Sequence, residues 1–246
     1  NPYLGLLAAA VAGALVSMVL AVFSIKYVVN QIIVGVVLNV LVSGLTGFLF
    51  STVMQANKEM FNSPGRLPII EVPVLSSIPV LGPILFKQSV VGYLMYVAVI
   101  LVWIGLFKTK WGLRVRSVGE HPQAADTLGI KVNATRFWNV TLGGAVAGIG
   151  GSFFTLVAID SFTKEISGGR GFIALAAVIF GRWDPVRVAL ACLLFAAAET
   201  FQIRLQGAGV IPSQFVEMIP YLLTIVALAG VVGRVVGPAA VGKVSE

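Results

Sequence analysis

The sequence predicts an all-α, polytopic membrane protein: a bundle of transmembrane helices with one broken or half-spanning helix and a short helix on the cytoplasmic side. Hydrophobic residues make up 58% of the 246 residues and charged residues only 11%, about half the charge of a typical soluble domain. Apolar runs of about 18 residues or more recur, and each can cross a hydrocarbon core of about 30 Å as a helix. Because the runs do not alternate polar with apolar residues, a β-barrel is not expected.

The whole chain, residues 1–246, is expected to form a single transmembrane domain. Seven hydrophobic segments are predicted, at Leu4–Val22, Ile32–Met54, Val90–Phe107, Phe137–Ile159, Ile166–Phe180, Val186–Phe201 and Phe215–Val232. The fifth segment is the weak one, because its wholly apolar part, Phe172–Phe180, is too short to cross a bilayer and follows the glycine-rich stretch "SGGRG". It is therefore interpreted as the broken or half-spanning helix.

The distribution of basic residues predicts the orientation of the chain. If the loop at residues 108–136 is cytoplasmic, the inside loops and tail hold eleven Lys and Arg, and the outside loops hold six. Basic residues favour the cytoplasmic side of membrane proteins. The N-terminus is therefore expected outside and the C-terminus in the cytoplasm. Because the basic residues flank the membrane spans, the net charge of +7 is attributed to contact with membrane lipid, and no nucleic-acid partner is expected.

The outer loop at residues 55–89 is long and proline-rich. Its stretch "NSPGRLPIIEVPVLSSIPVLGP" contains five prolines, which prevents a continuous helix. The stretch is also too apolar for a disordered linker. It is expected to pack against the membrane surface or a partner, with a structured cap that has no partner as the alternative.

A short polar helix is expected in the inner loop, in the stretch "GEHPQAADTLGIKV". Pro122 suits the first turn of a helix, and Gly129 suits the left-handed position that ends one. A helix of two turns is marginal by itself, and nothing in the loop is expected to bury it. Either it sits in a cleft of a cytoplasmic partner or it lies on the bilayer, although the small apolar face of Ala124, Ala125 and Leu128 argues against strong lipid binding.

Small residues form a stripe on the fourth segment, within "GGAVAGIGG". Gly144 and Gly148 make a GxxxG pair, and Gly151 extends it. Such stripes let helix backbones approach closely. Tight helix packing is the expected role, and a packed surface that slides during transport is a functional variant of it.

Two further groups of polar residues fall within or beside apolar segments. Asn39, Ser43 and Thr46 share one face of the second segment, and exposing this face to lipid would cost free energy. These residues either hydrogen-bond a neighbouring helix or line a water-filled path.

Glu199, with Gln202 one turn later, lies near the outer end of the sixth segment. A carboxylate in a span suggests function, so an outer vestibule and a plain acid at the end of a helix both remain open.

The sequence argues against an enzyme. "GPAAVGKV" resembles a phosphate-binding loop, but Val244 stands where a hydroxyl would bind Mg²⁺, and the strand–loop–helix context is missing. The single histidine, His121, and the single cysteine, Cys192, allow no Cys/His metal cluster. No cofactor or metal is expected, and no chain of acids suggests ion coupling.

The stretches "GLRVRSVGEHPQAADTLGIKV" and "ISGGRGFIALAAVIFGRWDP", with the glycine-rich helix between them, resemble the membrane permease of bacterial ABC importers for simple sugars and nucleosides. The similarity covers about residues 31–230 and is closest to the nucleoside branch, whose partner is a substrate-binding lipoprotein. Members of this family carry about three further helices upstream, so the resemblance implies an N-terminally incomplete sequence.

The resemblance implies partners and roles for particular residues. The helix of the inner loop would be a coupling helix seated in a groove of a cytoplasmic ABC ATPase, and the outer loops would receive an extracytoplasmic substrate-binding protein. The path would run between two permease subunits, in a homo- or heterodimer, beside the discontinuous segment Gly168–Phe180. The coupling residues would be Glu120, His121, Pro122, Ala124, Ala125, Asp126 and Gly129.

The expected function is therefore that of a permease subunit in the bacterial inner membrane that moves nucleosides by alternating access, while a separate chain hydrolyses ATP. A simple-sugar permease is the first alternative and a passive channel for small polar solutes the second; an intramembrane enzyme would need a reactive centre that is not visible. The candidate path residues are Asn39, Ser43, Thr46, Phe153, Gly168, Gly169, Phe172, Glu199 and Gln202, of which the aromatic ones could stack a base or merely fill space.

Overall fold

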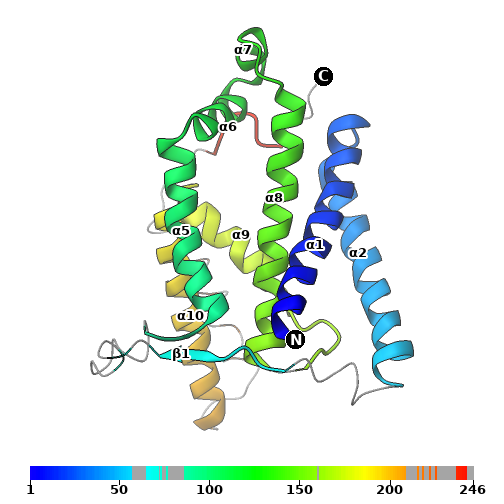
Figure 1. Cartoon of the computed structure of the whole chain (residues 1–246), viewed down its shortest axis with the longest axis vertical. Coiled ribbons are helices and arrows are strands. Elements are labelled where there is room, and N and C mark those ends of the chain that lie inside the picture. Colours follow the sequence, from blue (N-terminus) through cyan, green and yellow to red (C-terminus); the bar gives the residue numbers. More distant parts are fainter. Residues whose placement is uncertain are drawn as a thin grey trace. The chain divides into compact units, whose positions relative to one another are not determined.

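Long helices dominate the computed structural model (Figure 1). The structure describes residues 1–56, 65–71, 73, 76, 86–159, 161–208, 215, 218, 222, 225 and 237–242. Within them, five helices are long and apolar enough to cross a membrane: Pro2–Lys26, Gln31–Met54, Val90–Lys108, Val132–Ala158 and Pro185–Gly207. The predicted class, an all-α polytopic membrane protein, is confirmed.

The helices follow the predicted apolar runs, and three of them end in a π-helical turn. The elements are α1 (Pro2–Ala21) with η1 (Val22–Lys26), α2 (Gln31–Leu49) with η2 (Phe50–Met54), α5 (Val90–Lys108), α6 (Lys110–Glu120), α7 (Pro122–Thr127), α8 (Val132–Phe153) with η4 (Phe154–Ala158), α9 (Arg170–Phe180) and α10 (Pro185–Ala208). The seventh predicted segment, Phe215–Val232, lies almost entirely outside the described residues.

The fifth segment contains a short helix whose start differs from the expected one. Gly168 and Gly169 have φ angles of +51° and +76°, which interrupt a right-handed helix, so α9 begins at Arg170 and not at Ile166. Its 11 residues rise about 16 Å, about half of a hydrocarbon core. This length agrees with the expected broken or half-spanning helix.

The chain forms two units, each with its own packing: Asn1–Ala98 with Arg114–Gly168 and Gly242–Glu246, and Val99–Leu113 with Gly169–Val241. In the first unit, α1 packs along α8 through small residues. A Cβ atom on Gly13 would lie 3.0 Å from the Cα of Gly148, and one on Gly148 would lie 2.9 Å from the carbonyl carbon of Ala9. The Ser17 hydroxyl also donates to the Thr141 carbonyl at 3.4 Å. The two backbones therefore touch without intervening side chains.

Part of the outer loop adds a small sheet that the all-α prediction did not include. Strands β1 (Ile69–Glu71) and β2 (Lys87–Ser89) pair antiparallel, with Glu71 opposite Lys87, and these two side chains form an ion pair at 3.2 Å. Beside the sheet, buried Leu67 donates its N–H to the Leu156 carbonyl at 3.1 Å. Residues 67–71 of the loop are thus fastened to the rest of the first unit, while most of the loop's prolines lie outside the described residues.

In the second unit, α9 and α10 form a helical hairpin. The turn between them places Arg182 and Trp183 at positive φ angles of +52° and +61°. The Asp184 carboxylate then caps α10 by accepting the N–H groups of Val186 and Arg187 at 3.1 and 3.0 Å. The side chains between the helices form an apolar seam of Ile173, Ala177, Phe180, Ala191 and Phe195.

Candidate functional site

The short helix α7 is held by its own loop. Ala125 is only 2% exposed and packs against Val118 from α6 and Val132 from α8, with Ile130 beside them. The expectation that nothing in the loop could bury this helix was wrong, because the ends of both flanking helices contribute a valine to a small core. The helix is therefore a fixed projection of the first unit and does not depend on a partner to form.

Both ends of α7 match the sequence signals. Pro122 occupies its first turn, and Gly129 follows it with a φ angle of +79°. The Gly129 N–H donates to the Asp126 carbonyl at 2.8 Å, and the Ile130 N–H donates to the Ala125 carbonyl at 3.1 Å. The left-handed glycine thus reverses the chain and brings Ile130 back to the core beneath the helix.

The outward surface of α7 is small and mixed in polarity. Leu128 is 81% exposed, and Ala124 and Asp126 are exposed as well. Glu120 and His121 are exposed at the start of the helix. Of the residues predicted to couple, Ala125 is therefore covered by its own chain and can act only by supporting the helix, whereas its neighbours are accessible to a partner.

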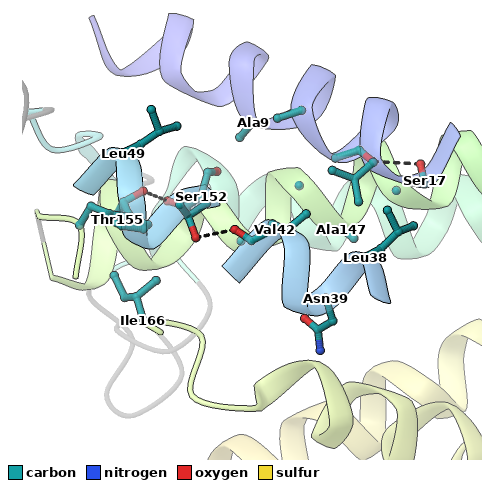
Figure 2. Close-up of a pocket in the computed structure, with 18 of the residues that line it drawn as sticks. Ala9, Ser17, Leu38, Asn39, Val42, Leu49, Ala147, Ser152, Thr155 and Ile166 are labelled. Carbon is teal, nitrogen blue, oxygen red and sulfur yellow. Dashed lines mark hydrogen bonds between the residues drawn. The ribbon is translucent and has the colours of Figure 1, made fainter. Parts of the chain in front are cut away.

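A cavity of about 920 Å³ lies among α1, α2 and α8 in the first unit (Figure 2). Asn39 and Thr46 line it from α2, as do Gly144, Gly148 and Gly151 from α8. Ser43, predicted to share their face, is not among its lining residues. The space exists because glycines and alanines on α1 and α8 leave little side-chain volume beside α2.

Most hydroxyl groups along this cavity are already satisfied within their own helices. Thr46 donates to the Val42 and Ser43 carbonyls at 2.8 and 3.1 Å, and Thr155 donates to the Ser152 carbonyl at 3.1 Å. These groups therefore present methyl and methylene surface to the cavity. Among the described residues, the Thr46 hydroxyl bonds its own helix and no neighbouring helix.

Asn39 differs from these hydroxyls. It is exposed, and among the described residues no side-chain hydrogen bond is made by its amide. Two donors and one acceptor on a membrane helix are costly to leave in hydrocarbon. Its surroundings in the assembled protein must therefore contain water, a solute or a polar group of another chain.

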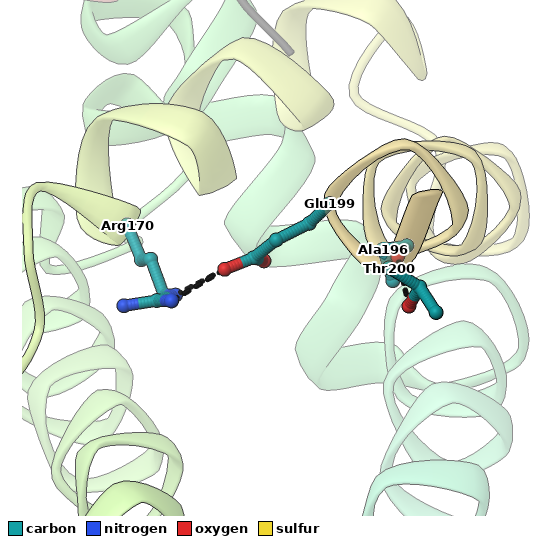
Figure 3. A network of polar contacts seen from close by, with 4 residues as sticks. All are labelled: Arg170, Ala196, Glu199 and Thr200. Atoms are coloured by element: carbon teal, nitrogen blue, oxygen red, sulfur yellow. Dashed lines mark hydrogen bonds and ion pairs between the residues drawn. The ribbon is translucent and has the colours of Figure 1, made fainter. Parts of the chain in front are cut away.

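In the second unit, Glu199 on α10 is paired with Arg170, the first residue of α9 (Figure 3). The Arg170 Nε donates to Glu199 Oε1 at 2.9 Å, and an Nη group donates to the same oxygen. Sequence reasoning counted Arg170 only as a basic residue of an outer loop and missed this pair. The sequence shows only that each residue extends the apolar face of its own helix; that the two faces meet depends on the turn at Arg182 and Trp183.

The remaining path candidates belong to both units of the chain. Phe153 belongs to the first unit and is 38% exposed, whereas Phe172 belongs to the second unit and is 72% exposed. Gly168 is the last described residue of its segment in the first unit, and Gly169 begins the second. Gln202 lies three residues after Glu199 and is partly buried. The predicted path residues are thus shared between the two units.

Comparisons with known proteins agree with these features. Residues 1–237 match the family described as the branched-chain amino acid transport system / permease component. The chain is 41% identical over 246 residues to the nucleoside ABC transporter permease protein NupC of Lactococcus lactis subsp. cremoris, covering 98% of this chain and 77% of that protein. It is 39% identical over 245 residues to the guanosine ABC transporter permease protein NupQ of Bacillus subtilis, covering 98% and 76%.

A third relative carries a different substrate in its name. The chain is 32% identical over 257 residues to the putative glucose ABC transporter permease protein TsgC13 of Haloferax volcanii, covering 95% of this chain and 76% of that protein. No solved structure matches.

Proposed function

Because this chain belongs to the permease-component family of branched-chain amino acid transport systems, we propose that it is the membrane permease subunit of an ATP-driven importer of nucleosides. The observation that carries the substrate class is the 41% identity to a nucleoside permease over 98% of this chain. The 39% identity to a guanosine permease supports the same class. The five long apolar helices provide the multi-pass membrane body that such a subunit needs.

The energy for transport comes from a separate ATPase chain that grips α7. A partner shifts a conformational equilibrium only by the difference between its affinities for the two states. Binding of the ATPase to α7 must therefore move the helix bundle and not only bend a loop. The small core of Val118, Ala125 and Val132 supports this role, because it ties α7 to the ends of α6 and α8.

The partners follow from this arrangement. The C-terminus and α7 face the cytoplasm, and the sheet of β1 and β2 faces outward, where a substrate-binding protein delivers solute. A second permease subunit completes the path.

A sugar importer is the second candidate function. It is favoured by the 32% identity to a putative glucose permease. Sugars and nucleosides are both neutral and rich in hydroxyl groups, so the two candidates differ in whether the path also accommodates a base.

Uptake into cells that express the complete transporter tests both candidates. Cells with the permease, its ATPase and its binding protein are expected to accumulate labelled guanosine, and a transporter whose ATPase cannot hydrolyse ATP is expected to accumulate none. Uptake of glucose or ribose in place of guanosine would favour the second candidate. Guanosine flux that persists without ATP hydrolysis would point to a passive channel.

Replacing Asn39 with alanine is expected to reduce guanosine uptake about tenfold while the amount of protein in the membrane stays near the wild-type level. Asn39 lines the cavity of the first unit. Its amide has hydrogen-bonding capacity that the described residues do not use, and a lost polar contact to solute or water is of this size. Uptake normalised to membrane-embedded protein measures the effect. Thr46→Val is the matched control, because the Thr46 hydroxyl bonds only its own helix. Parallel losses of uptake and of protein in the Asn39 variant would indicate a packing role.

A further inference from the structure

The ion pair of Arg170 and Glu199 closes one end of the seam between α9 and α10. Residues spaced by three or four along a helix share a face. On α10, Glu199 follows the buried Phe195 by one turn, and on α9, Arg170 precedes Ile173 by one turn. The two charges therefore continue the same interface that the apolar side chains begin at the turn.

This position lies well inside the membrane. Ten residues separate Arg170 from Phe180 at the turn, a rise of about 15 Å along α9, and fourteen separate Glu199 from Pro185, a rise of about 21 Å along α10. A hydrocarbon core measures about 30 Å. With the turn at one face of the membrane, Arg170 sits at about the midplane and Glu199 beyond it, well short of the end of α10 at Ala208.

The pair does not behave like a buried structural ion pair. The side chain of Arg170 is 41% exposed and that of Glu199 is 34% exposed. Charged groups at this depth are strongly disfavoured in lipid and face a protein interior or a water-filled space. The exposed part of the pair therefore borders a water-filled space, a polar solute or a polar group of another chain.

The bonding within the pair leaves one acceptor open. The Nε and Nη groups of Arg170 both donate to Glu199 Oε1, and no donor among the described residues reaches Oε2. The pair is also neutral as a whole. A cation would compete with Arg170 for the carboxylate, and an anion would compete with Glu199 for the guanidinium, whereas a neutral hydroxyl group can donate to Oε2 without disturbing the pair.

We infer that Glu199 is a substrate contact that accepts hydrogen bonds from the sugar hydroxyls of the transported nucleoside, and that Arg170 positions its carboxylate. Acidic side chains bind ribose hydroxyls in this way in dinucleotide-binding proteins. This inference rests on the proposed function and adds to it a requirement for the sugar. The base is not read at this position.

The wild-type transporter provides the first test. Unlabelled guanosine is expected to inhibit uptake of labelled guanosine about tenfold more strongly than 2′,3′-dideoxyguanosine does, because a site that bonds a hydroxyl discriminates against an analogue that lacks it. Equal inhibition by the two compounds would overturn the inference and leave the proposed function intact. Absence of guanosine uptake in the wild-type transporter would instead overturn the proposed function.

Variants then assign the effect to this residue. In Glu199→Gln, the preference for guanosine over the dideoxy compound is expected to fall several-fold, because an uncharged acceptor bonds a hydroxyl more weakly. The matched control is Thr200→Val. The Thr200 hydroxyl donates to its own helix, to the Ala196 carbonyl at 2.8 Å, and points away from Arg170 in Figure 3, so the wild-type preference is expected. A Glu199→Gln transporter whose uptake is reduced but whose preference stays at the wild-type level would contradict the assignment.

A variant in which the two charged residues are exchanged distinguishes a substrate contact from an ion pair that only holds α9 against α10. Arg170→Glu combined with Glu199→Arg retains one ion pair across the hairpin but moves the carboxylate to α9. If the pair serves only to hold α9 against α10, the double variant has wild-type uptake and the wild-type preference for guanosine. If Glu199 contacts the substrate, the double variant folds in wild-type amounts but lacks the preference for the sugar hydroxyls.

Discussion

Replacing Gly148 with valine is expected to lower the free energy of unfolding by about 3 kcal/mol, the upper part of the range for overpacked sites. A Cβ atom at this position would collide with the backbone carbonyl of Ala9 and would lie 3.3 Å from the Cα of Gly13. Backbone atoms cannot move aside as a side chain can, so α1 would have to separate from α8. The loss of stability is measured by heating the purified protein in detergent and recording the fraction that remains monodisperse at each temperature.

The control for this substitution lies on the same helix. Gly143 has no atom within 4 Å of its Cβ position, so Gly143→Val makes the same change in helix propensity without a collision. Its midpoint is expected to stay close to that of the wild-type protein. Equal destabilisation by the two substitutions would show that glycine flexibility, and not the close approach of α1 to α8, determines stability here.

The glycine stripe illustrates what the sequence could predict about packing. The spacing of Gly144 and Gly148 indicated a close helix neighbour, but it did not identify α1. The partner carries its own small residues at Ala9, Gly13 and Ser17, four apart, and this repeat was visible in the sequence. It was uninformative because small residues are frequent in transmembrane helices, and only the three-dimensional pairing distinguishes a contact face from a lipid face.

The broken helix and the ion pair show a second limit. The glycines before Arg170 indicated an interruption, and the structure has one there. The pairing of Arg170 with Glu199 depends on the turn between α9 and α10, where Arg182 and Trp183 adopt left-handed conformations. Such conformations are unusual for residues with a Cβ atom, so composition gave no basis for a tight hairpin at this point.

The short helix α7 was predicted more fully, because its two ends carry residues with strong backbone preferences. Pro122 and Gly129 define it in the sequence and in the structure. Its support was missed, since Val118 and Val132 were assigned to the flanking helices and not considered as a core for the loop. Short segments in loops can thus be stable when the helices on either side each contribute one apolar residue.

Replacing Gly129 with valine is expected to reduce association with the ATPase about tenfold, while the transmembrane body remains folded. The φ angle of +79° costs an L-residue about 1–2 kcal/mol, and a β-branched side chain suffers most. No atom lies within 4 Å of the Cβ position, so crowding contributes nothing and the effect comes from the backbone. Relief of the strain withdraws Ile130 from the Ala125 carbonyl and releases α7 from its core.

Asparagine at the same position separates the backbone effect from the loss of glycine itself. Asparagine tolerates the left-handed region far better than valine does, so Gly129→Asn is expected to bind the ATPase nearly as the wild-type protein does. The measurement is the amount of ATPase that co-purifies with each tagged permease, with detergent-solubilised melting curves as the check on folding. If valine and asparagine weaken association equally, the partner contacts residue 129 directly. If neither weakens it, α7 is not held by the ATPase, and energy must enter the membrane body through another surface.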